Sequence, residues 1–259
     1  MRFDGKIAVV TGAATGMGAA TARLLAAEGA QLVVGDINEA GGMAIAEELR
    51  GVFMRTDVGV RDEVEALIET AVVRHGRIDI LFNNAGIGHY GKTPATSAEA
   101  WERVIAVDLN ATFYACHAAI PHMPKPGGAI INNASISGLG GDHGMSAYNA
   151  AKGALVNYTR SLAVDHAAEG IRVNAICPGY IETPLAAAIA AMPRLQQAWV
   201  SAIPMGRPGR AEEIAKVVAF LASDEASYIT GVALPVDGGV TAWTGQPDAG
   251  RFIEGLKLN

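Results

Sequence analysis

Hydrophobic and polar positions along the chain alternate between two patterns. Short runs rich in valine and isoleucine indicate strands, and most are followed by a longer stretch with apolar residues at helical spacing. The strand runs cover residues 6–12, 31–36, 52–58, 78–86, 128–135, 171–179 and 232–239. The helical stretches cover residues 17–28, 39–49, 61–75, 99–118, 146–168 and 211–222.

This alternation predicts the fold class. The inner strand runs are continuously apolar, as expected of strands that are covered on both faces. Strand–helix repeats of this kind build a parallel sheet with right-handed crossovers. No linker, low-complexity segment or internal repeat interrupts the 259 residues. We therefore predict a single domain (1–259), an α/β, Rossmann-type, doubly wound parallel β-sheet flanked by helices on both faces.

One segment departs from the pattern. Residues at about 180–210 contain several prolines and carry apolar residues at helical spacing, directly after a predicted strand. Because ligands bind beyond the carboxyl ends of the strands in open α/β sheets, we predict one or two short helices that form a lid over a substrate pocket. An ordinary helical hairpin that completes the core is the alternative.

Composition and charge narrow the class of protein. The net charge of −6 and the scattered acidic residues argue against a nucleic-acid partner. Cys116 and Cys177 are far apart and lack metal-ligand spacing, as do the histidines, so we expect reduced thiols and no metal site. The chain shows no signal-peptide pattern and no apolar run of membrane-span length. We therefore expect a cytoplasmic protein with no membrane partner.

The first strand–helix junction, TGAATGMG, is rich in glycine. Gly12, Gly16 and Gly18 permit a tight turn, and the helix N-terminus that follows offers free N–H groups to a pyrophosphate. The spacing of the glycines is not that of G-x-G-x-x-G, and a glycine-rich turn alone is weak evidence, because any tight strand–helix junction could use one. Asp36 ends the second strand, where a carboxylate can bind the adenosine ribose hydroxyls. Capping of the next helix is the alternative role for Asp36.

Asp36 also bears on the choice of cofactor. A 2′-phosphate beside this carboxylate would be repelled, and neither Thr15 nor Ile37 supplies a positive charge to offset the repulsion. We therefore predict NAD rather than NADP. Asp57 and Val58 follow the third strand and are placed to frame the adenine.

Tyr148 and Lys152 stand four residues apart in SAYNAAKGAL and share a face of the predicted helix. A phenol with a pKa of about 10 is a poor base near neutrality. A nearby ammonium should lower that pKa, so the pair could exchange a proton with an alcohol or a carbonyl. Ser135, thirteen residues before the tyrosine, could hold the substrate oxygen. For the pair alone, a surface lysine beside a half-buried tyrosine is the alternative.

Several motifs occur together in one order: TGxxxGxG, NNAG at 83–86, a serine thirteen residues before YxxxK, and PGYIETP at 178–184. In this combination nearly the whole chain resembles the short-chain dehydrogenase/reductase family. The resemblance implies that Ser135, Tyr148 and Lys152 are a catalytic triad, in which Tyr148 is the acid/base and Lys152 also binds the nicotinamide ribose. It implies Asn110 as a fourth member that holds a water in a proton relay. Ser137 is a second nearby hydroxyl, but the spacing favours Ser135.

The resemblance also implies which residues surround the cofactor. Asn84 would lie beside it, and Ile181 and Thr183 would contact the carboxamide. The expected cofactor-binding residues are Gly12, Thr15, Gly16, Met17, Gly18, Asp36, Ile37, Asp57, Val58, Asn84, Ala85, Gly86, Tyr148, Lys152, Pro178, Gly179, Ile181 and Thr183.

The expected substrate pocket is largely apolar. Its residues are Ile136, His143, Tyr180, Leu185 and Met192, with Ile87, His89, Tyr90, Met145, Ile189 and Trp199 as further wall candidates. No arginine or lysine cluster is present to hold a carboxylate or a phosphate. The pocket therefore predicts a small hydrophobic alcohol or ketone as the partner, with no net charge.

These observations predict an NAD(H)-dependent oxidoreductase that interconverts a hydrophobic secondary alcohol and its ketone by hydride transfer. The alternatives are a 3-ketoacyl-thioester reductase using NADPH, against which Asp36 argues, and a non-catalytic nucleotide-binding scaffold. The helical stretches 99–118 and 146–168 carry apolar residues on more than one face, and with the resemblance they favour a homotetramer. The tail after Gly239 either crosses to a neighbouring subunit or caps its own domain.

Overall fold

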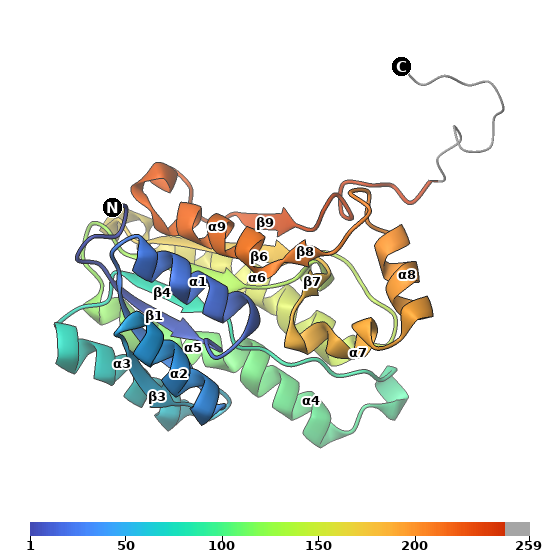
Figure 1. Cartoon of the computed structure of the whole chain (residues 1–259), viewed down its shortest axis with the longest axis horizontal. Helices are drawn as coiled ribbons and strands as arrows, with labels where there is room; N and C mark the ends of the chain where they lie inside the picture. The colour runs from blue at the N-terminus through green and yellow to red at the C-terminus, as the bar shows by residue number, and fades with distance from the viewer. Residues whose placement is uncertain (247–259) are drawn as a thin grey trace, which may run out of the picture.

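The predicted strands form one parallel sheet. The computed structural model describes residues 1–246, and its strand order is β3-β2-β1-β4-β5-β6-β9 with each neighbouring pair parallel (Figure 1). The strands are β1 (Ile7–Thr11), β2 (Gln31–Asp36), β3 (Val52–Arg55), β4 (Ile80–Asn83), β5 (Ala129–Asn133), β6 (Arg172–Pro178) and β9 (Ala233–Val236). The predicted doubly wound α/β fold is confirmed.

Helices cover both faces of this sheet. Because successive side chains of a strand point to opposite faces, Val10 and Phe82 meet one helical layer while Val9 and Leu81 meet the other. The first layer contains α1 (Gly16–Ala27), α2 (Glu39–Leu49) and α9 (Ala211–Ala222). The second contains α3 (Arg61–His75), α5 (Ala111–Ala119) and α6 (Ser146–His166). The bounds of α2, α3 and α9 are those predicted from the periodicity.

The helix predicted over residues 99–118 is interrupted. It consists of α4 (Ala98–Ile105), a π-helical turn (Ala106–Asn110) and α5. A π turn inserts an extra residue, so it changes the direction in which the side chains within it point relative to a regular helix. Val107 and Asp108 are buried in this turn, and Asp108 is only 1% exposed.

A stretch that includes these residues, Ala98–His122, has the length and composition of a candidate membrane span. The expectation that no apolar run reaches that length is therefore wrong. In the fold, α4 packs against α6, and α5 packs against α3. Val104, Ala115 and Cys116 are buried in these contacts, and the packing explains the apolar composition.

The segment after β6 contains the predicted short helices, α7 (Ala187–Ala190) and α8 (Pro193–Ser201). It is bracketed by a small parallel pair that the sequence did not predict, β7 (Ile181–Glu182) and β8 (Gly209–Arg210). No residue of α7 or α8 is buried, which disfavours the alternative that they complete the core.

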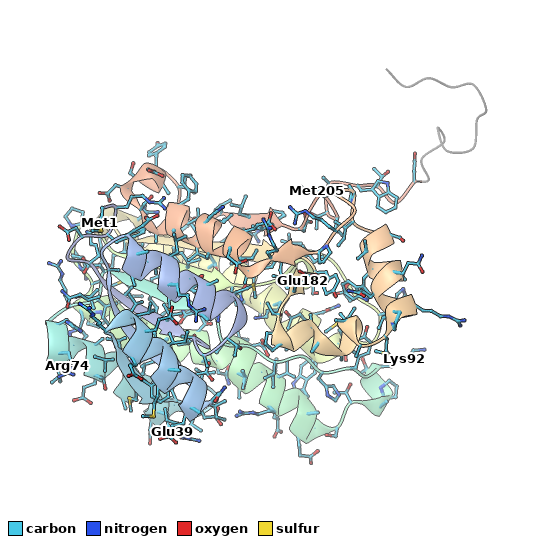
Figure 2. All side chains as sticks on the ribbon, in the orientation of Figure 1. Met1, Glu39, Arg74, Lys92, Glu182 and Met205 are labelled. Carbon is cyan, nitrogen blue, oxygen red and sulfur yellow. The ribbon has the colours of Figure 1, made fainter. Side chains whose placement is uncertain are left out.

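The two ends of the strands face different surroundings. Glu182 and Lys92 lie toward the end of the molecule where the strands terminate, and Met1 and Arg74 lie toward the other end (Figure 2). Helices α7 and α8 stand at the carboxyl ends of the strands (Figure 1). The two roles considered for the tail concern residues 240–259, most of which lie outside the described residues.

Candidate active site

A cavity of about 680 Å³ lies beyond the carboxyl ends of the strands. It brings together almost all residues expected at the cofactor and the substrate. Of the expected cofactor residues only Gly18 does not line it, and of the expected triad all three members do. Ile136, Tyr180 and Leu185 line it as predicted, but Asn110, His143 and Met192 do not.

The turn between β1 and α1 forms one end of the cavity. Gly12 and Gly16 have φ values of +64° and +56°, which side chains rarely adopt. Thr15, at the N-terminus of α1, makes no side-chain capping hydrogen bond, so the N–H groups of the first turn are free to bind an anion. Gly18 has a packing role, since a Cβ there would lie 2.1 Å from the carbonyl oxygen of Gly12.

Asp36 ends β2 and lines the same end of the cavity. Its carboxylate oxygens accept hydrogen bonds from the N–H groups of Ala14 and Asn38, each at 2.8 Å. The side chain of Asn38, rather than Asp36, caps α2 by accepting from the N–H of Gly41 at 3.1 Å. With one N–H per oxygen, the Asp36 carboxylate keeps lone pairs for further donors such as ribose hydroxyls.

The lysine and arginine side chains that line the cavity, among residues 1–246, are Arg103 and Lys152, and both are paired with carboxylates. Arg103 donates from Nη2 to both oxygens of Asp57 at 3.0 Å. Burial raises the pKa of Asp57, but Arg103 and the N–H of Gly59 outweigh it and lower that pKa. In the same range of residues, no group of three or more histidine, cysteine or acidic side chains is arranged to hold a metal.

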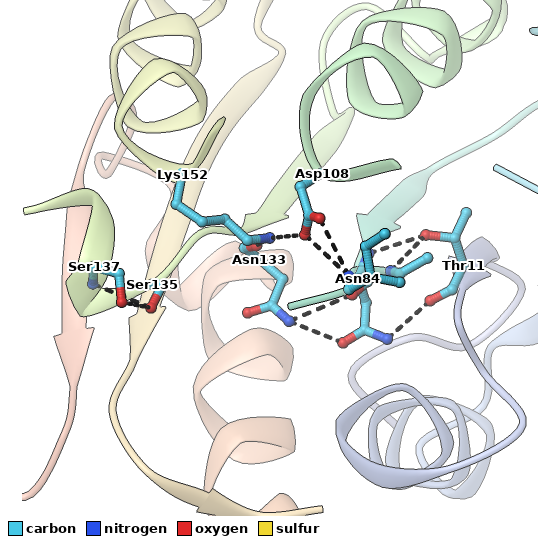
Figure 3. A network of polar contacts seen from close by, with 9 residues as sticks. Thr11, Asn84, Asp108, Asn133, Ser135, Ser137 and Lys152 are labelled. Carbon is cyan, nitrogen blue, oxygen red and sulfur yellow. Dashed lines mark hydrogen bonds and ion pairs between the residues drawn. The ribbon is translucent and has the colours of Figure 1, made fainter. Parts of the chain in front are cut away.

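An amide network joins the turn to the centre of the sheet (Figure 3). The Asn84 side chain donates to the carbonyl oxygens of Thr11 (2.9 Å) and Gly12 (3.0 Å) and accepts from Asn133 Nδ2 at 3.1 Å. Asn133 lines the cavity, and its buried Oδ1 has no hydrogen-bond partner within the described part of the chain. This acceptor, the open N–H groups of α1 and Asp36 fit a bound dinucleotide.

Lys152 projects from α6 into the buried centre of the site. Its Nζ lies 3.1 Å from Asp108 Oδ1 and donates to the carbonyl oxygen of Asn133 at 2.8 Å (Figure 3). Burial lowers the pKa of Lys152, but Asp108 and Tyr148 outweigh it and raise that pKa. Lys152 therefore keeps its ammonium form, and its two partners, Asp108 and the Asn133 carbonyl, fix the position of Nζ.

The structure places Asp108, rather than Asn110, at Lys152. Both residues belong to the π-helical turn, yet only Asp108 lines the cavity, and its carboxylate also accepts from the N–H of Ile87 at 3.2 Å. The sequence analysis overlooked Asp108. An acidic residue inside an otherwise apolar helical run was the signal that could have identified it, because a buried carboxylate needs a partner.

Tyr148 lies one helical turn before Lys152, with the lysine Nζ 5.5 Å from the ring centroid. Burial has the largest effect and raises the pKa of Tyr148; Lys152 lowers it, while Asp108 and Asp142 raise it. The net direction is upward. Lys152 therefore acts in the expected direction, but in the chain alone burial and the two carboxylates outweigh its effect on this pKa.

Ser135 and Ser137 are both buried and are joined to each other. Their Oγ atoms lie 3.1 Å apart, and Ser135 Oγ accepts from the N–H of Ser137 at 3.1 Å. Ser137 Oγ in turn donates to the carboxylate of Asp142, which also lines the cavity. Asp142 was not identified from the sequence, because it lies in a loop where no periodicity gives the direction of a side chain.

The far end of the cavity is apolar. The rings of Tyr180 and Trp199 lie 5.8 Å apart and tilted at 59°, and they connect α8 to the end of β6. Met145 and Ile189 also line this end. The site therefore combines a dinucleotide cradle, a tyrosine and lysine on one helix, a buried serine and an apolar chamber, which is the arrangement of a dinucleotide-dependent oxidoreductase.

Comparisons with known proteins agree with this class. The family described as "Enoyl-(Acyl carrier protein) reductase" matches residues 12–241. Meso-2,3-butanediol dehydrogenase of Serratia marcescens is 43% identical over 251 residues, covering 95% of this chain and 99% of that protein. Cis-4-hydroxycyclohexanecarboxylate dehydrogenase of Sinomonas cyclohexanicum is 47% identical over 248 residues, covering 93% and 98%.

A solved structure supports the same assignment. Levodione reductase superposes with a TM-score of 0.89 at 36% identity, covering 93% of this chain and 99% of that one. The chain belongs to the short-chain dehydrogenase/reductase family, whose members use NAD or NADP. The predicted family is thus confirmed.

Proposed function

We propose that the protein is an NAD(H)-dependent oxidoreductase that interconverts a hydrophobic secondary alcohol and its ketone by hydride transfer, with Tyr148 as acid/base. The observation that carries this proposal is the convergence of Ser135, Tyr148 and Lys152 on the cavity that also contains the dinucleotide cradle. A non-catalytic scaffold would not require all three groups at that position.

Each of the three side chains has a role that follows from its surroundings. A bound nicotinamide supplies the acceptor for the hydride of the alcohol. Tyr148 takes the hydroxyl proton, Ser135 holds the reacting oxygen, and the Lys152 ammonium stabilises the tyrosinate. Burial raises the pKa of Tyr148 and so disfavours the tyrosinate. The positive charge of an oxidised nicotinamide would act together with that of Lys152 against this effect and favour the tyrosinate.

The preference for NAD is supported by the charges around Asp36. This carboxylate lines the cavity beside Ile37, and a 2′-phosphate would approach it without a compensating cation. Arg103 is occupied by Asp57, and Lys152 by Asp108. We propose that the other residues expected from the sequence to bind the cofactor do so in the roles given above.

A reductase of thioester-linked 3-ketoacyl chains that uses NADPH is the second candidate. The description of the matching family, which names an acyl-carrier-protein substrate, favours it. The charges at Asp36 oppose it. A higher kcat/KM with NADPH and an acetoacetyl thioester than with NADH and a cyclic ketone would establish this candidate instead.

We further propose a cytoplasmic homotetramer in which residues 180–210 close over the substrate. Exposed apolar side chains on α4, α5 and α6 support the assembly: Trp101, Phe113 and Val164 are 41%, 49% and 79% exposed. Both cysteines are free and buried, consistent with a reducing compartment. Light scattering coupled to size exclusion tests the assembly, and a monomer would contradict it.

Tyr148→Phe tests the central proposal. Removal of the phenol should reduce kcat for cyclohexanol oxidation with NAD by about a hundredfold to ten-thousandfold, the usual contribution of a positioned acid/base. NADH binding, followed by its fluorescence, should fall far less than kcat, because only one hydroxyl of the cofactor site is removed. Tyr158→Phe is the matched control, since Tyr158 lies on the same helix but does not line the cavity. Full activity in Tyr148→Phe would overturn the mechanism.

A further inference from the structure

The carboxylate of Asp142 differs from the other charged groups that line the cavity. Lys152 is paired with Asp108, and Arg103 with Asp57, whereas Asp36 binds two main-chain N–H groups. Within residues 1–246, the only hydrogen-bond partner of the Asp142 carboxylate is the Ser137 hydroxyl. One of its two oxygens is therefore available to a ligand.

Asp142 stands close to the reacting end of the cavity. Its carboxylate is joined through Ser137 to Ser135, two hydrogen bonds away from the hydroxyl that would hold the reacting oxygen. Its charge also raises the pKa of Tyr148. Because Asp142 lines the same cavity within two hydrogen bonds of Ser135, it is within reach of a group next to the reacting carbon of a substrate held by Ser135 and Tyr148.

The surroundings of Asp142 determine which groups it can accept. A carboxylate accepts hydrogen bonds but donates none, so it favours a hydroxyl and repels a second carboxylate. Met145, Tyr180 and Trp199 line the same cavity with their largely apolar side chains, and His89 and Tyr90 line it as well. Neither cation of the cavity is free to offset its charge. A substrate without a donor at this point would displace water from the free oxygen of this exposed side chain and leave that oxygen unpaired, which is unfavourable.

We propose that Asp142 selects substrates that carry a second hydroxyl beside the reacting carbon, namely neutral diols and hydroxy ketones. This inference rests on the proposed alcohol oxidation. It changes the expected substrate from a plain hydrophobic alcohol to one with an apolar body and one additional hydroxyl. The second hydroxyl donates to the free oxygen of Asp142 while Ser137 occupies the other oxygen.

Matched substrates on one carbon skeleton test the proposal. Cyclohexanol, cyclohexane-1,2-diol and 2-hydroxycyclohexanecarboxylate differ only in the group next to the reacting carbon. For the wild-type protein the order of kcat/KM should be diol, alcohol, hydroxy acid. Asp142→Asn keeps the shape of the side chain and removes its charge. It should lower the diol-to-alcohol ratio about tenfold or more, since hydrogen bonds to charged groups are the stronger ones.

Two further measurements distinguish a role of Asp142 in substrate selection from a role in stabilising the loop that contains it. The diol should lose activity in Asp142→Asn mainly through a higher KM, because the contact exists equally before and during the reaction. The hydroxy acid should gain, because the repulsion is removed. Asp165→Asn is the matched control on the exposed surface of α6, and all three substrates should be unaffected by it.

The possible results are distinguishable. An equal fall for all three substrates in a variant with an unchanged Tm would show a supporting role and overturn the proposal. An unchanged diol-to-alcohol ratio would overturn it as well, while leaving the oxidation of alcohols intact. If the wild-type protein oxidises none of the three with NAD or NADP, then the proposed function fails, and this inference fails with it.

Discussion

Among residues 1–246, every charged side chain at the dinucleotide end of the cavity has a charged or main-chain partner, whereas the Asp142 carboxylate at the other end accepts a hydrogen bond only from a hydroxyl. The walls differ in the same way. Asn84 is fixed to the β1–α1 turn by two hydrogen bonds, but the short helices α7 and α8 contain no buried residue.

This difference suits the two ends of the cavity to two tasks, cofactor binding at one end and substrate selection at the other. The dinucleotide end is built from the turns that close the sheet, so a change there should alter the core together with binding. The alcohol end is built from a loop and from short helices at the surface, so a change there should alter selectivity at little cost in stability. The comparison can be tested from both sides.

Gly18→Ala should have the largest effect. The new Cβ would lie 2.1 Å from the carbonyl oxygen of Gly12 and 2.6 Å from Asn84 Nδ2, so α1 or the turn must move. We expect a fall in Tm together with a loss of NADH affinity of at least about tenfold, equivalent to about 1.4 kcal/mol. Fluorescence titration and thermal unfolding measure the two effects.

Gly153→Ala is the matched control for this substitution. It also adds a methyl group within a helix, but the nearest heavy atom to its Cβ, the carbonyl oxygen of Gly138, is 3.8 Å away. Alanine favours a helix over glycine by about 1 kcal/mol, so Tm should stay the same or rise. If Gly18→Ala left Tm and NADH affinity as little changed as Gly153→Ala does, the dinucleotide end of the cavity would not be rigid.

Asp108→Asn tests the centre of the cavity and should have an intermediate effect. Asp108 raises the pKa of Tyr148, so removal of its charge should lower that pKa. The tyrosinate would then be present at lower pH, and the acidic limb of the pH profile of kcat/KM for alcohol oxidation should move to lower pH. Unfolding should be easier by up to about 3 kcal/mol, because the Lys152 ammonium stays buried without its anion.

Asp79→Asn provides the comparison. Asp79 is also buried and paired, accepting from the N–H of Ile7 at 2.9 Å and from Arg77 Nε at 3.0 Å, but it does not line the cavity. Its replacement should reduce stability and leave the pH profile in place. An acidic limb that moves equally in both variants would contradict a specific effect of Asp108 on Tyr148.

Trp199→Ala should have the smallest effect. Trp199 contacts Tyr180 from the exposed helix α8, and aromatic pairs contribute about 0.5–1.5 kcal/mol. We expect KM for a cyclic alcohol to rise by about two- to tenfold, with NADH affinity and Tm unchanged. Gln197→Ala, on the same helix but outside the cavity, should change none of these quantities. A large loss of Tm in Trp199→Ala would place α8 in the core.

The fold could be predicted from the sequence because local pattern and tertiary packing agree. The strand runs are mostly apolar and each helix carries periodic apolar residues, so α2, α3 and α9 have their expected bounds. The π-helical turn at Ala106–Asn110 could not be predicted, since one inserted residue leaves the apolar composition unchanged. That turn decides whether Asp108 or Asn110 reaches Lys152.

The site could be predicted where a residue type and its spacing define the chemistry. Tyr148 and Lys152 share a helix face, and Asp36 ends a strand, so their positions follow from regular structure. Asp142, His143 and Met192 lie in or beside loops, where the backbone gives no rule for side-chain direction. Only the three-dimensional arrangement shows that Asp142 lines the cavity, while His143 and Met192 do not.

A second pair of amides, next along β4 and β5 to the Asn84–Asn133 network, has a consequence for folding. Asn83 Nδ2 donates to Asn132 Oδ1 at 2.9 Å, and these two residues stand opposite each other in the β4–β5 ladder. A slip of the ladder by one residue would leave buried amides facing hydrocarbon. Asn83 and Asn132 should therefore disfavour a shifted register of β4 against β5 during folding, before any ligand is bound.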